Sequence, residues 1–280
     1  MMGISADSVP ARLYHYTNID TLALILGNKS IRLMPLCGLD DPQENQTKDL
    51  YNFGRFFFVS CWTDDVRESI PMWRMYTNLD AGVRISLPAN PFRSYTYTKE
   101  EVSSIFNIPV DRIDGDETIT TFLPLEDAVS GMCSIAIFGG DKVLKKIEYT
   151  DDVSKLMPEI VKKHNENTEL DWSTFGVCKN TGWEFQHEWR YLLNLTPLNL
   201  FGDLSSLEER ASQMVQGMID GTASAPCECY DLRISDEAFA QIEITPSPKM
   251  SMGNQMLLKY LLDAHGLSDR MRQSQLAGLL

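Results

Sequence analysis

Residues 56–62 read Phe-Phe-Phe-Val-Ser-Cys-Trp, a nearly continuous apolar run rich in residues that favour extended structure. An apolar run of this length, without regular polar alternation, predicts a strand that is buried inside a sheet. No other segment of the chain carries as strong a signal for a buried strand. The remaining elements are therefore placed around it.

Strand and helix patterns are spaced unevenly on either side of this run. Regular βαβ repeats and a glycine-rich phosphate loop are both missing from the sequence. The pattern favours an α+β fold with mixed, mainly antiparallel sheets and flanking helices. The further strands are expected at 31–34, 82–87, 132–138, 143–149, 186–195, 229–234 and 242–245. The helices are expected at 18–26, 69–79, 152–164, 204–219 and 254–265. Gly139-Gly140-Asp141 predicts a hairpin between its two flanking strands.

The chain has 280 residues, enough for one large domain with a substantial core. We expect a single domain over 1–280, with its core at about 12–90 and 130–277. The segment from about 94 to 130 has mixed charge and little periodicity, which indicates an insertion. A capping box from Thr98 to Glu101 predicts a helix start inside it.

Composition limits the possible partners. The net charge of -14 argues against broad binding to duplex nucleic acid, which needs clustered Lys and Arg. No apolar run is long enough to span a bilayer, and the start of the chain lacks a basic stretch followed by an apolar one. We therefore expect a cytoplasmic protein that does not enter a membrane. The six cysteines are too scattered for a disulfide scaffold, and Cys227 and Cys229 lack the further ligands of a zinc finger.

Two short segments place polar side chains within strand-like runs. The first, Tyr14-His15-Tyr16-Thr17, leads directly into a helical pattern with Asn18 as its N-cap. A helix N-terminus beside such a strand favours anions. The second, residues 186–190, reads Gln-His-Glu-Trp-Arg. In an extended strand, Gln186, Glu188 and Arg190 share one face, which predicts a site there.

The order of these and three other motifs resembles the bacterial domain-of-unknown-function family 2971. The resemblance covers about Leu13 to Leu276, and its motifs are short. Membership of that family implies no particular activity. The motifs are Leu13–Thr17, Leu39–Glu44, Val59–Trp62, Met72–Tyr76 and Trp183–Arg190.

More distantly, the layout resembles ADP-ribosyltransferases that use a His, an aromatic or Ser, and a Glu. This resemblance implies a split sheet of that type, with His15 and Thr17 on the first strand holding a ribose of NAD. It also implies that the late Gln-x-Glu, Gln186 to Glu188, binds the nicotinamide ribose. On the second strand Ser60, Trp62 and Thr63 would wall the nicotinamide, although the Tyr common at that strand is missing.

The chemistry of NAD cleavage explains these residue types. The ribose–nicotinamide bond breaks through an oxocarbenium-like state, which a fixed carboxylate such as Glu188 stabilises. Flat side chains would grip the nicotinamide in a partly dry pocket. The pyrophosphate needs donors, which the helix start at Asn18 and Arg190 or Arg12 could supply. Catalysis is thus assigned to Glu188 and His15, and NAD binding to Tyr16, Thr17, Ser60, Trp62, Trp73, Tyr76, Gln186 and Arg190. We expect His15, Ser60 and Glu188 to converge on one pocket, from central strands with their polar groups on the same face of the sheet.

Three functions remain open. The first is an NAD-dependent ADP-ribosyltransferase or NAD glycohydrolase, with a macromolecular acceptor and a toxin or phage-defence setting; it requires no metal. The second is an inactive module that binds a nucleotide or a protein. The third is a metal-dependent hydrolase built on Asp40, Asp41, Glu44 and Glu188, disfavoured because the four histidines are dispersed. The same residues can also have purely structural roles. His15 can be a histidine packed in the core, and Glu188 and Arg190 can form an exposed ladder of salt bridges.

Overall fold

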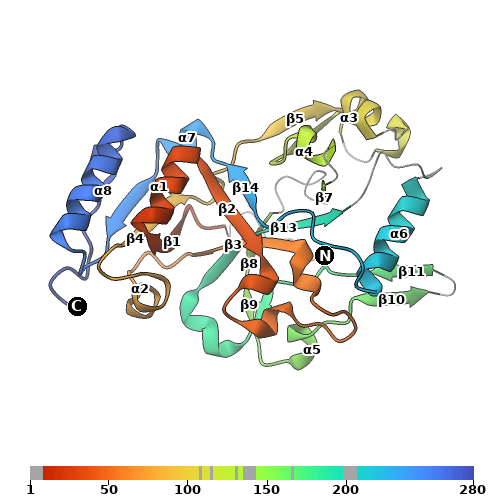
Figure 1. The fold of residues 1–280 in the computed structure, drawn as a ribbon, viewed down its shortest axis with the longest axis horizontal. Coiled ribbons are helices and arrows are strands. Elements are labelled where there is room, and N and C mark those ends of the chain that lie inside the picture. Colours follow the sequence, from red (N-terminus) through yellow and green to blue (C-terminus); the bar gives the residue numbers. More distant parts are fainter. Residues whose placement is uncertain are drawn as a thin grey trace.

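The structure is a computed structural model with an α+β fold, which confirms the class predicted from the sequence. Helices flank a large, mainly antiparallel sheet (Figure 1). The structure describes residues 9–106, 109–113, 116–129, 132–134, 143–164, 167–197 and 207–280.

The strands and helices are mostly short. The strands are β1 (Arg12–Asn18), β2 (Ser30–Pro35), β3 (Phe57–Thr63), β4 (Gly82–Pro88), β5 (Tyr95–Thr98), β6 (Thr118–Thr121), β7 (Met132–Ser134), β8 (Leu144–Lys146), β9 (Glu148–Tyr149), β10 (Val161–His164), β11 (Asn167–Leu170), β12 (Cys178–Lys179), β13 (Glu188–Pro197), β14 (Tyr230–Arg233) and β15 (Glu243–Pro246). The α-helices are α1 (Ile19–Asn28), α2 (Ile70–Tyr76), α3 (Lys99–Phe106), α4 (Leu125–Val129), α5 (Val153–Leu156), α6 (Leu207–Ile219), α7 (Asp236–Phe239) and α8 (Met252–Ala264). Two 3₁₀ segments bear on the site, η3 (Pro42–Asn45) and η8 (Thr181–Gln186). Within the described ranges, no helix combines the length and apolar composition needed to cross a bilayer.

The apolar run at 56–62 forms β3, and three other strands pair with it. β13 lies antiparallel along one edge, from Glu188 opposite Thr63 to Asn194 opposite Phe57. The other edge is shared: β2 pairs with it at Val59 and β1 only at Thr63. Between these two contacts β1 and β2 diverge, so the sheet is split beside the middle of β3.

Both faces of β3 and β13 are covered by apolar side chains, which explains the unbroken apolar pattern of this segment. On one face, Phe58 and Trp62 belong to the main hydrophobic cluster, together with α1 and the inner side chains of β1 and β4. On the other face, Phe57 and Val59 pack in a second cluster with Phe53 and other side chains. β3 is therefore a central strand, as its sequence predicts.

The unit β1–α1–β2 places α1 across the split, in front of the sheet in Figure 1. Leu22, Ile25 and Leu26 recur at helical spacing and are buried against the main cluster. Asn18 is the N-cap residue, but its side chain does not cap the helix. Instead, its Oδ1 accepts a hydrogen bond from the backbone N–H of Asn78.

Three sequence predictions of elements are wrong. The helix expected over 152–164 is only one turn, α5, because Pro158 interrupts it and the β-branched Val161 begins β10. β7 and β8 both pair antiparallel with β13, so they run parallel to each other and form no hairpin. The expected turn at 139–141 lies outside the described residues. Gln186 ends the 3₁₀ segment η8, and β13 begins only at Glu188.

The segment expected to be an insertion forms the β5–β6 pair with α3, η5 (Val110–Arg112) and α4 beside it. It lies at the upper right of Figure 1. The capping box is confirmed, since Thr98 and Glu101 exchange side-chain to backbone hydrogen bonds of 2.7 and 3.2 Å. Val102 and Ile119 join the main cluster, so this segment packs onto the same core.

Two leucines of α1 test this burial pattern. Leu22 is fully buried, whereas Leu24, two residues later, is 59% exposed. We expect Leu22→Ala to lower the free energy of unfolding by about 2–5 kcal/mol, since it leaves a cavity in the core. Leu24→Ala, the matched control, should change it by no more than about 0.5 kcal/mol. Urea unfolding measures both, and equal losses would contradict the placement of α1.

Candidate functional site

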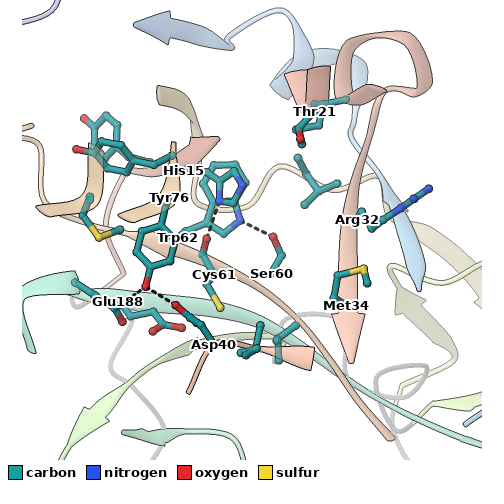
Figure 2. Close-up of a pocket in the computed structure, with 18 of the residues that line it drawn as sticks. His15, Thr21, Arg32, Met34, Asp40, Ser60, Cys61, Trp62, Tyr76 and Glu188 are labelled. Atoms are coloured by element: carbon teal, nitrogen blue, oxygen red, sulfur yellow. Dashed lines mark hydrogen bonds between the residues drawn. The ribbon is translucent and has the colours of Figure 1, made fainter. Parts of the chain in front are cut away.

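A cavity of about 460 Å³ lies at the split in the sheet. β1 and β2 form its sides, β3 crosses it, and α1 and α2 contribute side chains from neighbouring helices. Figure 2 shows His15, Trp62 and Ser60 at its centre, Tyr76, Asp40 and Glu188 toward one end, and Thr21, Arg32 and Met34 toward the other. Its volume falls within the range of about 300–1,000 Å³ that is typical of ligand sites.

His15 and Glu188 belong to opposite faces of the sheet, contrary to the sequence prediction that they share one. Tyr14 and Glu188 both lie opposite Thr63, so His15, next to Tyr14, alternates to the other side. Both nevertheless line the cavity. This is possible because β1 and β2 diverge here, and the gap between them gives access to side chains from both faces.

His15, Trp62 and Ser60 form a small cluster in the cavity. The ring centroids of His15 and Trp62 are 5.1 Å apart, and Trp62 Nε1 donates to Ser60 Oγ at 3.0 Å. His15 Nδ1 lies 2.8 Å from the carbonyl oxygen of Cys61. Because a carbonyl oxygen can only accept, Nδ1 carries the proton and Nε2 is left as an acceptor. Burial lowers the pKa of His15, although the bond to Cys61 opposes this, so the ring is neutral at pH 7.

Four buried charged side chains lie beneath the cavity, on the Glu188 face. We call Glu44, Lys179, Glu188 and Arg190 the ionic cluster. Arg190 donates to Glu188 Oε1 through Nε at 2.8 Å and Nη2 at 2.6 Å, and to Glu44 Oε1 at 2.6 Å. Lys179 Nζ lies 3.1 Å from Glu188 Oε2 and 3.5 Å from Glu44 Oε2. All four side chains are at most 4% exposed, so this is not the exposed ladder that the sequence allowed.

The two carboxyl groups of the ionic cluster differ in their pKa shifts. Burial disfavours the charged form of Glu188, but Arg190 and Lys179 outweigh it and hold the pKa of Glu188 below its usual value. Burial dominates at Glu44 and raises its pKa despite the same two cations. Glu188 is therefore the carboxylate that the cluster keeps charged.

A chain of hydrogen bonds links the ionic cluster to the rim of the cavity. Lys179 Nζ donates to Gln186 Oε1 at 2.9 Å, and Gln186 Nε2 donates to the hydroxyl of Tyr76. The Tyr76 hydroxyl in turn donates to Asp40 Oδ2 at 3.3 Å. Burial raises the pKa of Tyr76, so its hydroxyl keeps its proton and can act as this donor. Figure 2 shows Tyr76 pointing toward Asp40 and Glu188.

The cavity brings together seven of the residues predicted from the sequence. These are His15, Tyr16, Ser60, Trp62, Tyr76, Gln186 and Glu188.

Four other predicted residues do not line the cavity. Thr63 is buried at the end of β3, and its hydroxyl accepts from the backbone N–H of Asp65. Thr17 is buried opposite Val83 of β4. Trp73 is fully buried edge-on against Tyr16 and donates to Glu68. Arg190 is fully buried, and among the described residues its acceptors are Glu44, Glu188 and the carbonyl oxygen of Gly176.

The arginine donors expected for a pyrophosphate are likewise placed elsewhere. Arg12 donates to Ser86 and to the carbonyl oxygen of Gln241, and it does not line the cavity. The cationic side chains that do line it are Lys179 and Arg32, and Arg32 is also bound at 2.9 Å to Asp231.

Sequence reasoning missed Lys179, Arg32 and Cys61 as cavity residues. A lysine directly after Val177-Cys178 in an apolar, strand-like stretch is a weak signal of a buried charge. Its partners could not be identified, because they lie 7 to 135 positions away along the chain. That Cys61 lines the cavity can be inferred only once the pairing of β3 with β13 is known, because this pairing places its thiol beside Glu188 on the same face.

The comparison with known proteins adds no assignment. No protein-family model, no curated protein and no solved structure matches this chain. The resemblances to family 2971 and to ADP-ribosyltransferases therefore stay predictions. All five motifs that carry the first resemblance nevertheless contribute side chains to the cavity.

The acidic residues considered as metal ligands are engaged in other bonds. Asp41 caps η3 by accepting from the backbone N–H of Gln43, Asp40 accepts from Tyr76, and Glu44 and Glu188 belong to the ionic cluster. In the described part of the chain, no three His, Cys, Asp or Glu side chains are grouped so that they could hold a metal ion. The geometry gives the hydrolase hypothesis no support.

Removing one cation tests the ionic cluster. Arg190→Met leaves two buried carboxyl groups with Lys179 alone, and we expect it to lower the free energy of unfolding by about 3–5 kcal/mol. Lys155→Met removes an exposed, solvent-screened ion pair with Glu148 and should lower the free energy of unfolding far less. Urea unfolding at pH 7 compares the two. A similar small loss in both would contradict the burial of the cluster.

The pKa of His15 predicts a pH dependence of stability. Because the folded-state pKa lies below the unfolded value of about 6.5, His15 favours the folded state above that pH. This contribution is lost as the pH falls through 6.5 toward the folded pKa. We expect the loss of melting temperature between pH 8 and 5.5 to be smaller in His15→Gln than in the parent.

The exposed His187 provides the control for this measurement. It has φ of 46°, which asparagine tolerates, so His187→Asn should keep the parent's pH dependence. If His15→Gln lost as much melting temperature as the parent over the same interval, His15 would not be held neutral in the folded protein.

Proposed function

We propose that the cavity binds NAD and that the protein is an NAD-dependent ADP-ribosyltransferase or NAD glycohydrolase. The observation that carries the proposal is the convergence of His15, Ser60, Trp62, Gln186 and Glu188 on one cavity. These side chains come from three distant segments, and the sequence predicts for each of them a role in holding or cleaving NAD. A macromolecular acceptor and a toxin or phage-defence setting belong to the same proposal.

The chemistry of the cavity suits the two ribose–base units of a dinucleotide. His15 Nε2 is an acceptor that has no hydrogen-bond partner among the described residues, so a ribose hydroxyl can donate to it. The indole of Trp62 and the ring of Tyr76 offer flat surfaces for the nicotinamide. Arg32 can bind a phosphate oxygen in place of Asp231, a role first assigned to Arg190 or Arg12.

Glu188 is placed to stabilise positive charge at the ribose. It lines the cavity and stays ionised, as a carboxylate that faces an oxocarbenium-like transition state must. Its position within the ionic cluster fixes the carboxylate before substrate arrives. Preorganisation of this kind avoids the cost of reorienting the group during the reaction.

A second function is favoured by the charge balance of the ionic cluster. Both oxygens of Glu188 already interact with cations, Oε1 with Arg190 and Oε2 with Lys179. These cations reduce the field that Glu188 exerts on a developing positive charge. A module that binds the nucleotide without cleaving it is therefore the alternative.

Calorimetry with NAD and an assay for released nicotinamide decide between these functions. The assay uses the full chain in excess chelator, with and without cell lysate as a source of acceptors. We expect binding together with nicotinamide release. Binding without release would support the binding module. No binding at millimolar NAD, where even a site worth about 4 kcal/mol is occupied, would exclude both.

Glu188→Gln tests the carboxylate, with Glu44→Gln as its matched control. Each variant removes one carboxylate of the ionic cluster, so both are expected to melt below the parent. Only Glu188 lines the cavity. Glu188→Gln should lower turnover by about 10²-fold or more, the scale of a lost preorganised group, and Glu44→Gln by much less. Turnover is compared well below the melting temperature of both, and equal losses would remove Glu188 from the mechanism.

A further inference from the structure

Lys179 contacts several of the side chains that form the cavity and the ionic cluster. It is 3% exposed and ends the two-residue strand β12, which pairs in parallel with β9. Its ammonium group donates to Gln186 Oε1 at 2.9 Å and to Glu188 Oε2 at 3.1 Å. On its other sides lie Glu44 Oε2, at 3.5 Å, and the ring of Trp183, whose centroid is 4.7 Å away.

Lys179 and Arg190 hold different oxygens of Glu188. Arg190 binds Oε1 and does not line the cavity, whereas Lys179 binds Oε2 and does. Of the two cations that hold Glu188, Lys179 is therefore the one that reaches the cavity. A carboxylate held by both cations has one orientation, but one held by Arg190 alone can turn about its last bond.

Lys179 also fixes the direction of the hydrogen-bond chain to the rim. An ammonium group can only donate, so it selects the carbonyl oxygen of the Gln186 amide and directs the NH₂ group to Tyr76. Tyr76 then donates to Asp40. At the other end of the chain Asp40 can only accept, and without Lys179 only the 3.3 Å bond from Tyr76 to Asp40 would favour this orientation of the amide.

We propose that Lys179 is the positioning residue of the cavity: it holds Glu188 and Gln186, and through Gln186 also Tyr76, in the orientation that the reaction uses. This inference rests on the proposed function. It assigns Lys179 no contact with the reacting atoms.

Lys179→Met tests the proposal in the full chain, with Lys179→Arg as the conservative variant. Lys259→Met, on the exposed side of α8, is the control. We expect Lys179→Met to lower the rate of nicotinamide release at saturating NAD by at least about 10-fold, which corresponds to about 1.4 kcal/mol in the activation free energy. Its Kd for NAD should change by less than about 3-fold. Lys179→Arg should restore part of the rate, and Lys259→Met should match the parent.

Loss of charge balance needs a separate control, because Lys179→Met leaves two carboxyl groups with one cation and can prevent folding. The double variant Lys179→Met/Glu44→Gln removes one charge of each sign and keeps the pair of Glu188 with Arg190. It should recover most of the melting temperature but not the rate of nicotinamide release. Recovery of the parent rate would overturn the proposal, because charge balance and not positioning would then explain the loss.

A readout without NAD separates this inference from the proposed function. The side-chain NH₂ resonances of Gln186, identified by their loss in Gln186→Leu, report its bond to Tyr76. In the double variant we expect them to shift toward the values of a solvated amide. Unchanged resonances would overturn the proposal even if the parent neither bound nor cleaved NAD. If the resonances shift in the double variant and the parent does not act on NAD, positioning by Lys179 is supported and only the proposed function is refuted.

Discussion

The pairing of two carboxylates with two cations inside the protein is the constraint on which the cavity depends. Each member of the ionic cluster would be costly to bury alone, and the four together balance in charge. Glu44, Lys179 and the strand that carries Glu188 and Arg190 come from three separate segments. The cluster therefore forms only when η3, β12 and β13 are all in place, and it ties the floor of the cavity to the completed fold.

The split beside β3 explains how a sheet with two apolar faces can hold a polar cavity. β13 satisfies one whole edge of β3, whereas β1 and β2 satisfy only the two ends of the other. The unpaired middle is where side chains from both faces become accessible. His15 approaches from the face of the main cluster and Glu188 from the other face. The split therefore lets both side chains line one cavity, whereas a continuous sheet would separate them.

The ends of the cavity differ in character, and this bears on how a ligand could lie in it. Tyr76, Gln186 and Glu188 form a polar end with fixed hydrogen-bond directions. Toward the other end lie Thr21, Arg32 and Met34, and Arg32 is paired there with Asp231 (Figure 2). A ligand with a flat polar head and a longer, partly charged remainder matches this division. NAD, the ligand that we propose, has such a shape.

The sequence alone determined the α+β class, the central position of β3 and most of the residues that meet at the cavity, because local patterning records burial and periodicity. It could not determine that Gln186 lies outside the strand, that His15 and Glu188 occupy opposite faces, or that Arg190 is enclosed. Those outcomes depend on strand register and on where β1 and β2 separate. Lys179 shows the limit most clearly: a lysine at the end of a short apolar stretch is buried only because tertiary folding brings Glu44, Gln186 and Glu188 to it.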